Sequence, residues 1–282
     1  MASPQPNSFK LLFSILLLLG ISCKKKAELK LCSDTNMAEV KGCKLYQVTT
    51  NECDSVTGAN LYSYTGGFVI ESNFYTQTPT QSLPKPDVLN NINYDACKNH
   101  ILSWDQQWLD TWGRYGINAR REFDYLNHKL YRLRYYDLGT SLDKLALRST
   151  EEISYFSNFC VVLKKNGSGV LLRTDTAFFN TFGDIIKRVW KSETQLGTEY
   201  YLIDTNTLNP YGMVPNYEST MPRSKHITLS TYWEYNGKLV LEDSLYEYTK
   251  TTSGYLKSEI RYSNYGSGSR KVQNVYEYKD CY

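Results

Sequence analysis

Short runs in which apolar or aromatic residues alternate with polar ones dominate the sequence from residue 44 onward. Early examples are Lys44 to Thr50, Leu61 to Tyr64 and Phe68 to Ser72, which are separated by Gly, Asn, Asp and Ser. A period of two is typical of strands with one buried face, and such separators are typical of turns. The pattern predicts a mainly β fold: an antiparallel meander sheet built of successive hairpins.

The same alternation continues without a break from about Ile227 to Lys279, with short turns between the runs. Around Gly237 two hairpin registers compete. A two-residue loop would pair Tyr235 with Lys238, whereas a three-residue loop with a bulge would pair Glu234 with Lys238. Because the second register gathers the large aliphatic residues on one face, we predict the bulged loop.

One stretch has the spacing of a helix. Trp104, Trp108 and Trp112 recur every four residues, and Gly113 follows as a C-cap. We therefore predict a helical insertion at about 94–113 that packs against the sheet. The tryptophan stripe has two interpretations: it faces the core, which we favour because monomers rarely expose so large an apolar patch, or it stacks on the sugar rings of a ligand.

The N-terminus carries an apolar run from Leu11 to Leu19, which is shorter than the roughly 20 residues of a transmembrane helix and suits a secretory signal. Cys23 follows the small residue Ser22, and this segment resembles a bacterial lipobox. The resemblance implies that Cys23 carries diacylglycerol and palmitate and becomes the mature N-terminus. The alternative is an ordinary cleaved signal with an incidental cysteine. Lys24, where an acidic residue often signals inner-membrane retention, favours the outer membrane.

This assignment divides the chain into a signal peptide (1–22), a lipidated tether (23–40) and a single β-rich domain (41–282). Within that domain an aromatic residue, a glutamate and a tyrosine recur in turn, as in Trp233-Glu-Tyr235, Tyr246-Glu-Tyr248 and Tyr276-Glu-Tyr278. The element loosely resembles the hairpin repeats of YD (Rhs-like) proteins and of uncharacterised bacterial outer-membrane lipoproteins. That resemblance implies β-hairpins and no particular activity.

Six cysteines remain once Cys23 is set aside. An even number in an exported chain suits three disulfides, although the sequence cannot choose their pairing. The predicted disulfide cysteines are Cys32, Cys43, Cys53, Cys97, Cys160 and Cys281.

Candidate chemistry is sparse. The formal net charge is +3 and no long basic cluster lies outside the tether, which argues against a nucleic-acid partner. We identify no catalytic, metal-binding or cofactor-binding motif. The sequence therefore favours a membrane-anchored envelope lipoprotein with a non-enzymatic binding or structural role. The alternatives are a carbohydrate-binding accessory lipoprotein and a glycoside hydrolase-like enzyme with dispersed carboxylates. Expected partners are the bilayer, through the anchor, and a glycan or protein ligand.

Overall fold

The computed structural model describes residues 43–52, 55–65, 68–76, 86–96, 100–109, 114–138, 144–214, 221–235, 237–265 and 268–279. The predicted signal peptide, the tether and Cys23 lie outside these ranges. Among the described residues, no helix has the length and apolar character needed to span a bilayer.

Sixteen strands follow one another along the chain. They are β1 (Lys44–Glu52), β2 (Ser55–Thr65), β3 (Phe68–Tyr75), β4 (Val88–Tyr94), β5 (Ile101–Leu109), β6 (Tyr115–Leu126), β7 (Lys129–Asp137), β8 (Ala146–Tyr155), β9 (Phe159–Asn166), β10 (Leu171–Phe179), β11 (Ile185–Ser192), β12 (Leu196–Leu208), β13 (His226–Tyr235), β14 (Lys238–Lys250), β15 (Leu256–Tyr265) and β16 (Gly268–Lys279).

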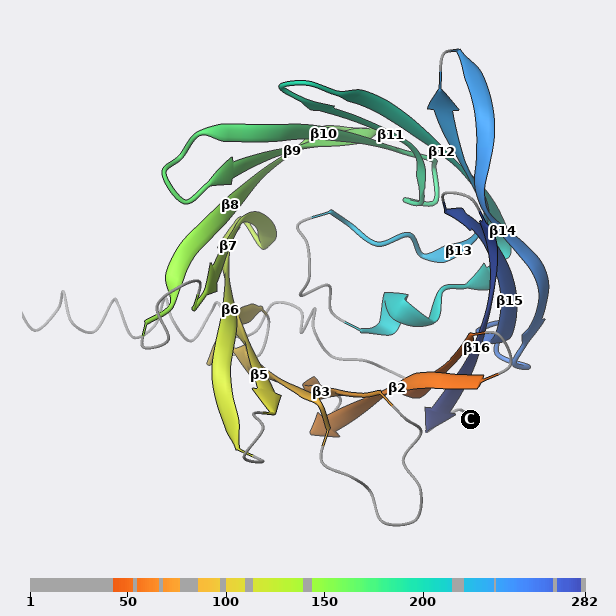
Figure 1. The fold of residues 1–282 in the computed structure, drawn as a ribbon, viewed down its shortest axis with the longest axis horizontal. Coiled ribbons are helices and arrows are strands. Elements are labelled where there is room, and N and C mark those ends of the chain that lie inside the picture. The colour runs from red at the N-terminus through yellow and green to blue at the C-terminus, as the bar shows by residue number, and fades with distance from the viewer. Residues whose placement is uncertain are drawn as a thin grey trace, which may run out of the picture.

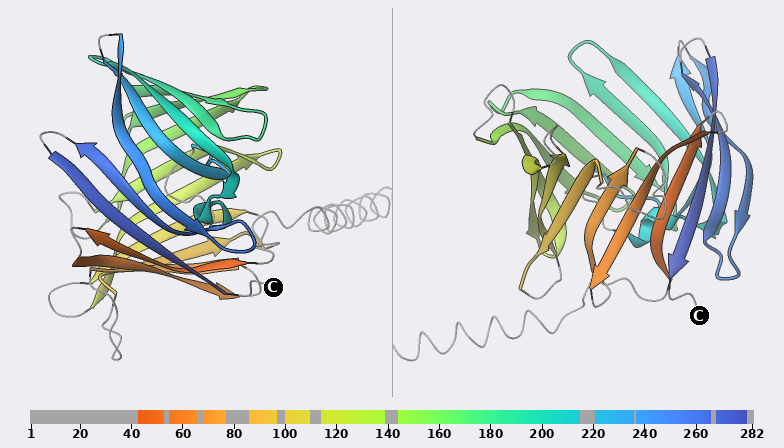
Figure 2. Two further views of the ribbon diagram at one scale, coloured as in Figure 1. Left: turned by 90° about the vertical axis from the view of Figure 1, so that its right-hand side faces the viewer. Right: turned by 60° about the horizontal axis from the view of Figure 1, so that its bottom comes forward.

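Each strand pairs with its neighbours in sequence, and β1 also pairs with β16, so the sheet closes into a barrel (Figure 1). All the pairings are antiparallel, and at the closure Val48 lies opposite Tyr276. The predicted mainly β, antiparallel meander is confirmed, including its C-terminal part from Ile227 to Lys279. The strands tilt around the barrel (Figure 2), which is the geometry that closure requires.

The barrel has two mouths, which we name from the chain. At the proximal mouth β1 begins, β16 ends, and β12 is joined to β13. At the distal mouth lie the connections from β5 to β6, from β9 to β10, from β11 to β12 and from β13 to β14. The first described strand, β1, therefore begins at the proximal mouth.

The predicted helical insertion at 94–113 is wrong, because Ile101–Leu109 is strand β5. Trp104 lies opposite Ile92 on β4 and opposite Arg121 on β6. A spacing of four residues is also a multiple of the two-residue strand period, so Trp104 and Trp108 share a face of a strand just as they would share a face of a helix. The described residues contain no α-helix; their one helix is the 3-10 helix η1 (Pro210–Met213).

The predicted register of the hairpin at Gly237 is also wrong. Tyr235 pairs with Lys238 and Trp233 with Val240, which is the register of the two-residue loop. Gly237 has a φ of 71°, as such tight loops demand. The irregularity that we expected at the loop lies further down the hairpin, between Thr231 and Tyr232.

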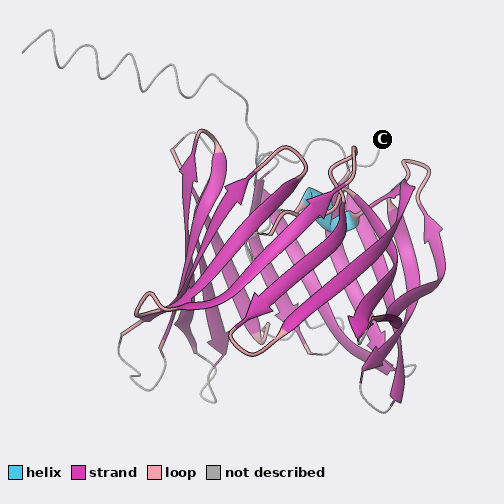
Figure 3. Cartoon of the chain, turned by 90° about the horizontal axis from the view of Figure 1, so that it is seen from above, coloured by secondary structure: helices cyan, strands magenta, loops and turns pink. Residues whose placement is uncertain are grey.

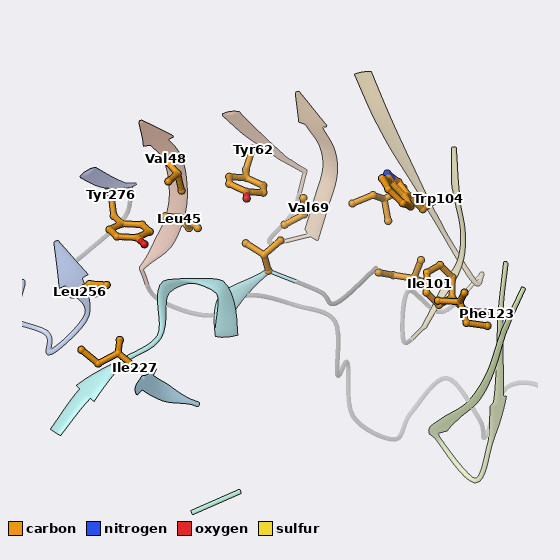
Figure 4. Close-up of a cluster of buried hydrophobic side chains, with 13 residues drawn as sticks. Leu45, Val48, Tyr62, Val69, Ile101, Trp104, Phe123, Ile227, Leu256 and Tyr276 are labelled. Atoms are coloured by element: carbon orange, nitrogen blue, oxygen red, sulfur yellow. The ribbon is translucent and has the colours of Figure 1, made fainter. Parts of the chain in front are cut away.

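The connection between β12 and β13 turns into the barrel and carries η1 (Figures 1 and 3). We call its described residues, 209–214 and 221–225, the luminal segment. Val214 of this segment belongs to the main buried apolar cluster. Leu45, Val69 and Ile227 of the wall, which are labelled in Figure 4, belong to the same cluster. Arg223 stabilises the segment by donating from Nη1 to the carbonyl oxygens of Tyr211 (3.0 Å) and Val214 (3.3 Å).

Candidate functional site: the wall, the lumen and the distal mouth

The buried cluster identifies which face of each strand points into the barrel. Trp104 and Phe123 belong to the same cluster as Val214 of the luminal segment, so these wall residues point inward. Side chains alternate across a strand, and therefore Asp105 and Glu122 point outward. Residues that pair across neighbouring strands point to the same face of the sheet. The registers of β4 to β9 therefore extend the inward and outward assignment to each of these strands.

The outer face of β5 to β9 carries a ladder of ion pairs. Arg120 Nε lies 2.6 Å from Asp105 Oδ1, and Lys165 Nζ lies 2.6 Å from Glu152 Oε2. Between them, Asp124 pairs with Arg132 (2.7 Å) and with Arg134 (3.1 Å). Asp105 is buried, and the other side chains of the ladder are half-buried to exposed. Each pair stabilises the fold by about 0 to 1 kcal/mol in water, whereas a charged side chain facing hydrocarbon would cost several kcal/mol. This part of the wall is suited to water.

Inside the barrel, Arg261 joins three strands. Its Nε donates to Glu259 Oε2 (2.7 Å), Nη1 donates to Asp243 Oδ2 (3.1 Å), and Nη2 donates to the carbonyl of Thr228 (2.6 Å). Tyr276 donates its hydroxyl to Glu259 Oε1 (2.7 Å). Burial, and then the charge of Glu259, raise the pKa of Tyr276 well above its ordinary value, so its hydroxyl keeps its proton and remains a donor.

A cavity of about 300 Å³ lies between this network and the luminal segment, with Tyr201 and Tyr211 in its lining. Asp243 and Glu259 both line it, which is the juxtaposition of carboxylates that a glycoside hydrolase would need. However, Arg261 bridges them, and both oxygens of Glu259 already accept hydrogen bonds, including one from Asn274 (2.9 Å). This arrangement supports the packing of the barrel rather than proton transfer to a substrate.

A second inward network links β10, β11 and β12. Asp175 is buried and pairs with Arg173 (2.7 Å) and Arg188 (2.8 Å), and Arg188 also lies 3.6 Å from Glu199. The Arg173 guanidinium stacks on the Trp190 ring, 4.6 Å from its centroid. All the charges here are paired within the wall.

One close pair was missed by the sequence reasoning. His226 Nδ1 lies 2.9 Å from Asp184 Oδ2, and the His226 backbone N–H donates to Asp184 Oδ1 (2.9 Å). The two residues lie 42 positions apart in the chain, at the turn between β10 and β11 and at the start of β13. No local pattern could have paired them.

The structure describes two of the three predicted stacking residues, and their environments differ. Trp104 is buried among the apolar cluster, with the Arg121 guanidinium 4.1 Å from its ring centroid. Trp108 is 54% exposed at the distal mouth, while Trp112 lies outside the described residues. The core-facing interpretation of the stripe therefore describes Trp104, and the solvent-facing one describes Trp108.

Two of the predicted disulfide cysteines fall within the described residues. Cys160 is a free thiol, fully buried, and burial raises its pKa to about 11. Cys43 is disulfide-bonded. The other four, Cys32, Cys53, Cys97 and Cys281, lie outside the described ranges.

A groove of about 770 Å³ opens at the distal mouth, where β5 turns into β6. Trp108, Tyr115, Ile117, Asn118 and Arg120 are among the residues that line it. It combines a large exposed indole with side chains that can form hydrogen bonds. Among the described parts of the barrel, this groove is the clearest candidate for ligand binding.

Comparison with known proteins supports the fold. A porin-like protein from Bacteroides uniformis has a similar structure, with a TM-score of 0.53 and 11% identity over 86% of this chain and 100% of that one. A porin-like protein from Bacteroides vulgatus is similar at a TM-score of 0.51 and 11% identity, over 83% of this chain and 98% of that one. No family model and no curated protein sequence matches the chain. The chain therefore has a porin-like barrel fold.

Proposed function

We propose that this protein is a lipid-anchored component of the bacterial envelope, whose barrel lies in water beside the outer membrane and binds a ligand without catalysing a reaction. The outer ladder of ion pairs on β5 to β9 is the observation that supports the proposal. Barrels that span a membrane present an apolar band to the lipid and keep their polar residues inside. Here charged residues such as Asp105, Arg120 and Asp124 occupy the outer face, while Trp104 and Phe123 point inward.

The anchor in this proposal is the lipid on Cys23. It would attach to the membrane a barrel whose outer face on β5 to β9 is polar, because several acyl chains together hold a protein at a bilayer surface. It also orients the molecule, because β1 begins at the proximal mouth and the distal mouth lies at the other end of every strand. A ligand approaching from the aqueous side would meet the distal mouth.

Replacing Cys23 with serine in the full-length chain tests both parts of the proposal. We expect the Cys23→Ser variant to be found in the aqueous fraction instead of the membrane fraction. It should elute as a single species from a sizing column without detergent. The unchanged protein should remain in the membrane fraction. If the variant still fractionates with membranes, or requires detergent to stay dispersed, the barrel itself contacts lipid and the proposal is wrong.

A further inference from the structure

We propose that the distal groove beside Trp108 binds pyranose oligosaccharides, with the Trp108 indole as a stacking platform. The inference rests on the proposed binding role and adds the ligand class and the surface. The groove has a volume of about 770 Å³ and includes Trp108, Tyr115, Asn118 and Arg120 in its lining. A pyranose ring offers an apolar face of C–H groups and a rim of hydroxyls, which suits an aromatic surface flanked by polar side chains.

The ring of Trp108 is exposed, whereas the ring of a second tryptophan of the barrel, Trp190, is covered. Trp108 lies opposite Gly116 on the next strand, and Trp190 lies opposite Gly197. A Cβ added at Gly197 would come within 2.4 Å of the Trp190 ring, so that indole lies flat on the glycine. A Cβ added at Gly116 would meet only Asn118 Oδ1, at 3.8 Å.

The two indoles consequently differ in exposure. Trp190 is 8% exposed and contributes to the packing of the wall, whereas Trp108 is 54% exposed. The barrel buries one indole over its facing glycine and leaves the equivalent indole exposed in a groove. The exposed ring is an aromatic surface available to another molecule.

A polar side chain lies beside the Trp108 ring in the same groove. The Asn118 side-chain amide has no partner in the described part of the chain, although its backbone carbonyl accepts from the Leu138 N–H (3.2 Å). Its Oδ1 lies 3.8 Å from where a Cβ at Gly116 would stand, and Gly116 faces Trp108. Such an amide can both donate to and accept from sugar hydroxyls.

The groove is held in shape before any ligand arrives. Tyr115 donates its hydroxyl to the carbonyl of Pro86 (2.7 Å), and the Leu109 N–H donates to the carbonyl of Asp87 (3.1 Å). These bonds tie the end of β5 and the start of β6 to the residues that precede β4. A wall fixed in this way loses little conformational entropy on binding.

The test uses the soluble Cys23→Ser protein on an array of pyranose oligosaccharides that includes fragments of β-glucan, α-glucan, xylan, mannan and chitin, followed by titration calorimetry with the best ligand. We expect at least one class to bind, and Trp108→Ala to weaken its Kd about tenfold, since loss of a stacked ring removes a contact of this size. Trp108→Phe should retain most of the affinity.

Phe156→Ala is the matched control, because Phe156 is also an aromatic residue with 54% exposure but lies at the turn between β8 and β9, at the proximal mouth. It should bind like the parent. Thermal unfolding of each variant confirms that the barrel is intact. Absence of binding to every oligosaccharide at millimolar concentration, or equal affinity in Trp108→Ala and parent, would falsify the sugar site. Either result would leave the fractionation of Cys23→Ser, and so the proposed anchored barrel, unaffected.

Discussion

At the scale of single residues, the pair of tryptophans facing glycines makes a direct prediction about stability. Gly197→Ala places a methyl group within 2.4 to 2.7 Å of the Trp190 indole, so the ring must move from its position over β12. We expect a loss of about 1 to 3 kcal/mol in the free energy of unfolding, which is typical of overpacking, measured by urea denaturation.

Gly116→Ala is the control for that change, because the facing residue is again a tryptophan but the space is open. Its free energy of unfolding should stay within about 0.5 kcal/mol of the parent, as for most exposed positions. Equal losses in the two variants would show that Trp190 does not lie on Gly197.

Asp184 makes a second prediction at this scale, which concerns pH. Burial alone would raise its pKa, but hydrogen bonds from His226 and Asn180 outweigh burial and hold the pKa below its ordinary value. A carboxyl whose pKa is lowered by folding stabilises the native state above its unfolded pKa of about 3.9, and that contribution is lost as the pH falls through the lower native value.

We therefore expect Asp184→Asn to reduce the free energy of unfolding by about 1 to 3 kcal/mol at pH 7, since it removes hydrogen bonds to a charged group. The difference from the parent should shrink as the pH falls below about 4. Urea denaturation at pH 7, 5, 4 and 3 measures this. Asp137→Asn, which affects a more exposed pair with Arg148, should cost under about 1 kcal/mol. A difference that stays constant down to pH 3 would contradict the role given to the Asp184 carboxylate.

At the scale of elements, sequence patterns predicted strands well where the alternation was continuous and failed where a second rule gave the same spacing. The region from β13 to β16 alternates over its whole length and was predicted as a meander. In β5, by contrast, the tryptophans are spaced four residues apart, which fits both a helix and a strand. The residues between them did not distinguish a helix from a strand.

The hairpin at Gly237 shows a different reason for failure. We expected one irregularity and placed it at the loop, because that position brought the aliphatic residues onto one face. The structure instead has a two-residue loop and a register shift between Thr231 and Tyr232. The positions of the aliphatic residues along a strand can show that the strand pair contains a bulge. They do not show where the bulge lies, because an extra residue anywhere between two positions moves the later side chain to the opposite face.

The luminal segment is the element whose role is most directly testable. Val214 is 3% exposed and packs with residues from both halves of the barrel wall. A charged side chain at this position would lie among apolar side chains with no group of opposite charge introduced to pair with it. We expect Val214→Asp to reduce the free energy of unfolding by about 3 kcal/mol or more, measured by urea denaturation.

Val170→Asp provides the comparison, since Val170 is 59% exposed at the turn between β9 and β10. The same change of side chain there should alter stability by about 0.5 kcal/mol at most. Similar stabilities for the two variants would mean that the luminal segment does not pack against the wall.

At the scale of the whole molecule, the barrel resembles porin-like proteins in its fold, while the outer face of β5 to β9 carries charged side chains that suit water. A fold does not determine the environment in which it works; the side chains on its faces do. The ladder that includes Asp124 and Arg134 lies outside, and the apolar cluster around Val214 fills the proximal part of the lumen. The distal groove at Trp108, rather than the lumen as a whole, is then the surface that we assign to a ligand.

Closure of the barrel could not be predicted from the sequence, although its hairpins could. Each hairpin joins neighbours in the chain, so the local alternation and the turns between the runs are enough to indicate it. The closing contacts between β1 and β16 join residues at opposite ends of the chain, such as Thr50 and Asn274, which lie 224 positions apart and share a hydrogen bond of 2.9 Å. An open meander and a closed barrel have the same local pattern, so no periodicity distinguishes them.

Closure also predicts how the molecule should respond to loss of its last strand. A chain that ends after Tyr265 lacks β16, and β1 and β15 then become edge strands with unpaired backbone groups, which are templates for aggregation. It also loses Tyr276, which donates to buried Glu259, so an unsatisfied polar group adds to the exposed edges. We expect this chain, in the Cys23→Ser background, to aggregate. A chain that ends after Lys279 keeps all of β16 and should elute from a sizing column like the full-length protein. A soluble, single species from the shorter chain would show that the sheet is stable when open.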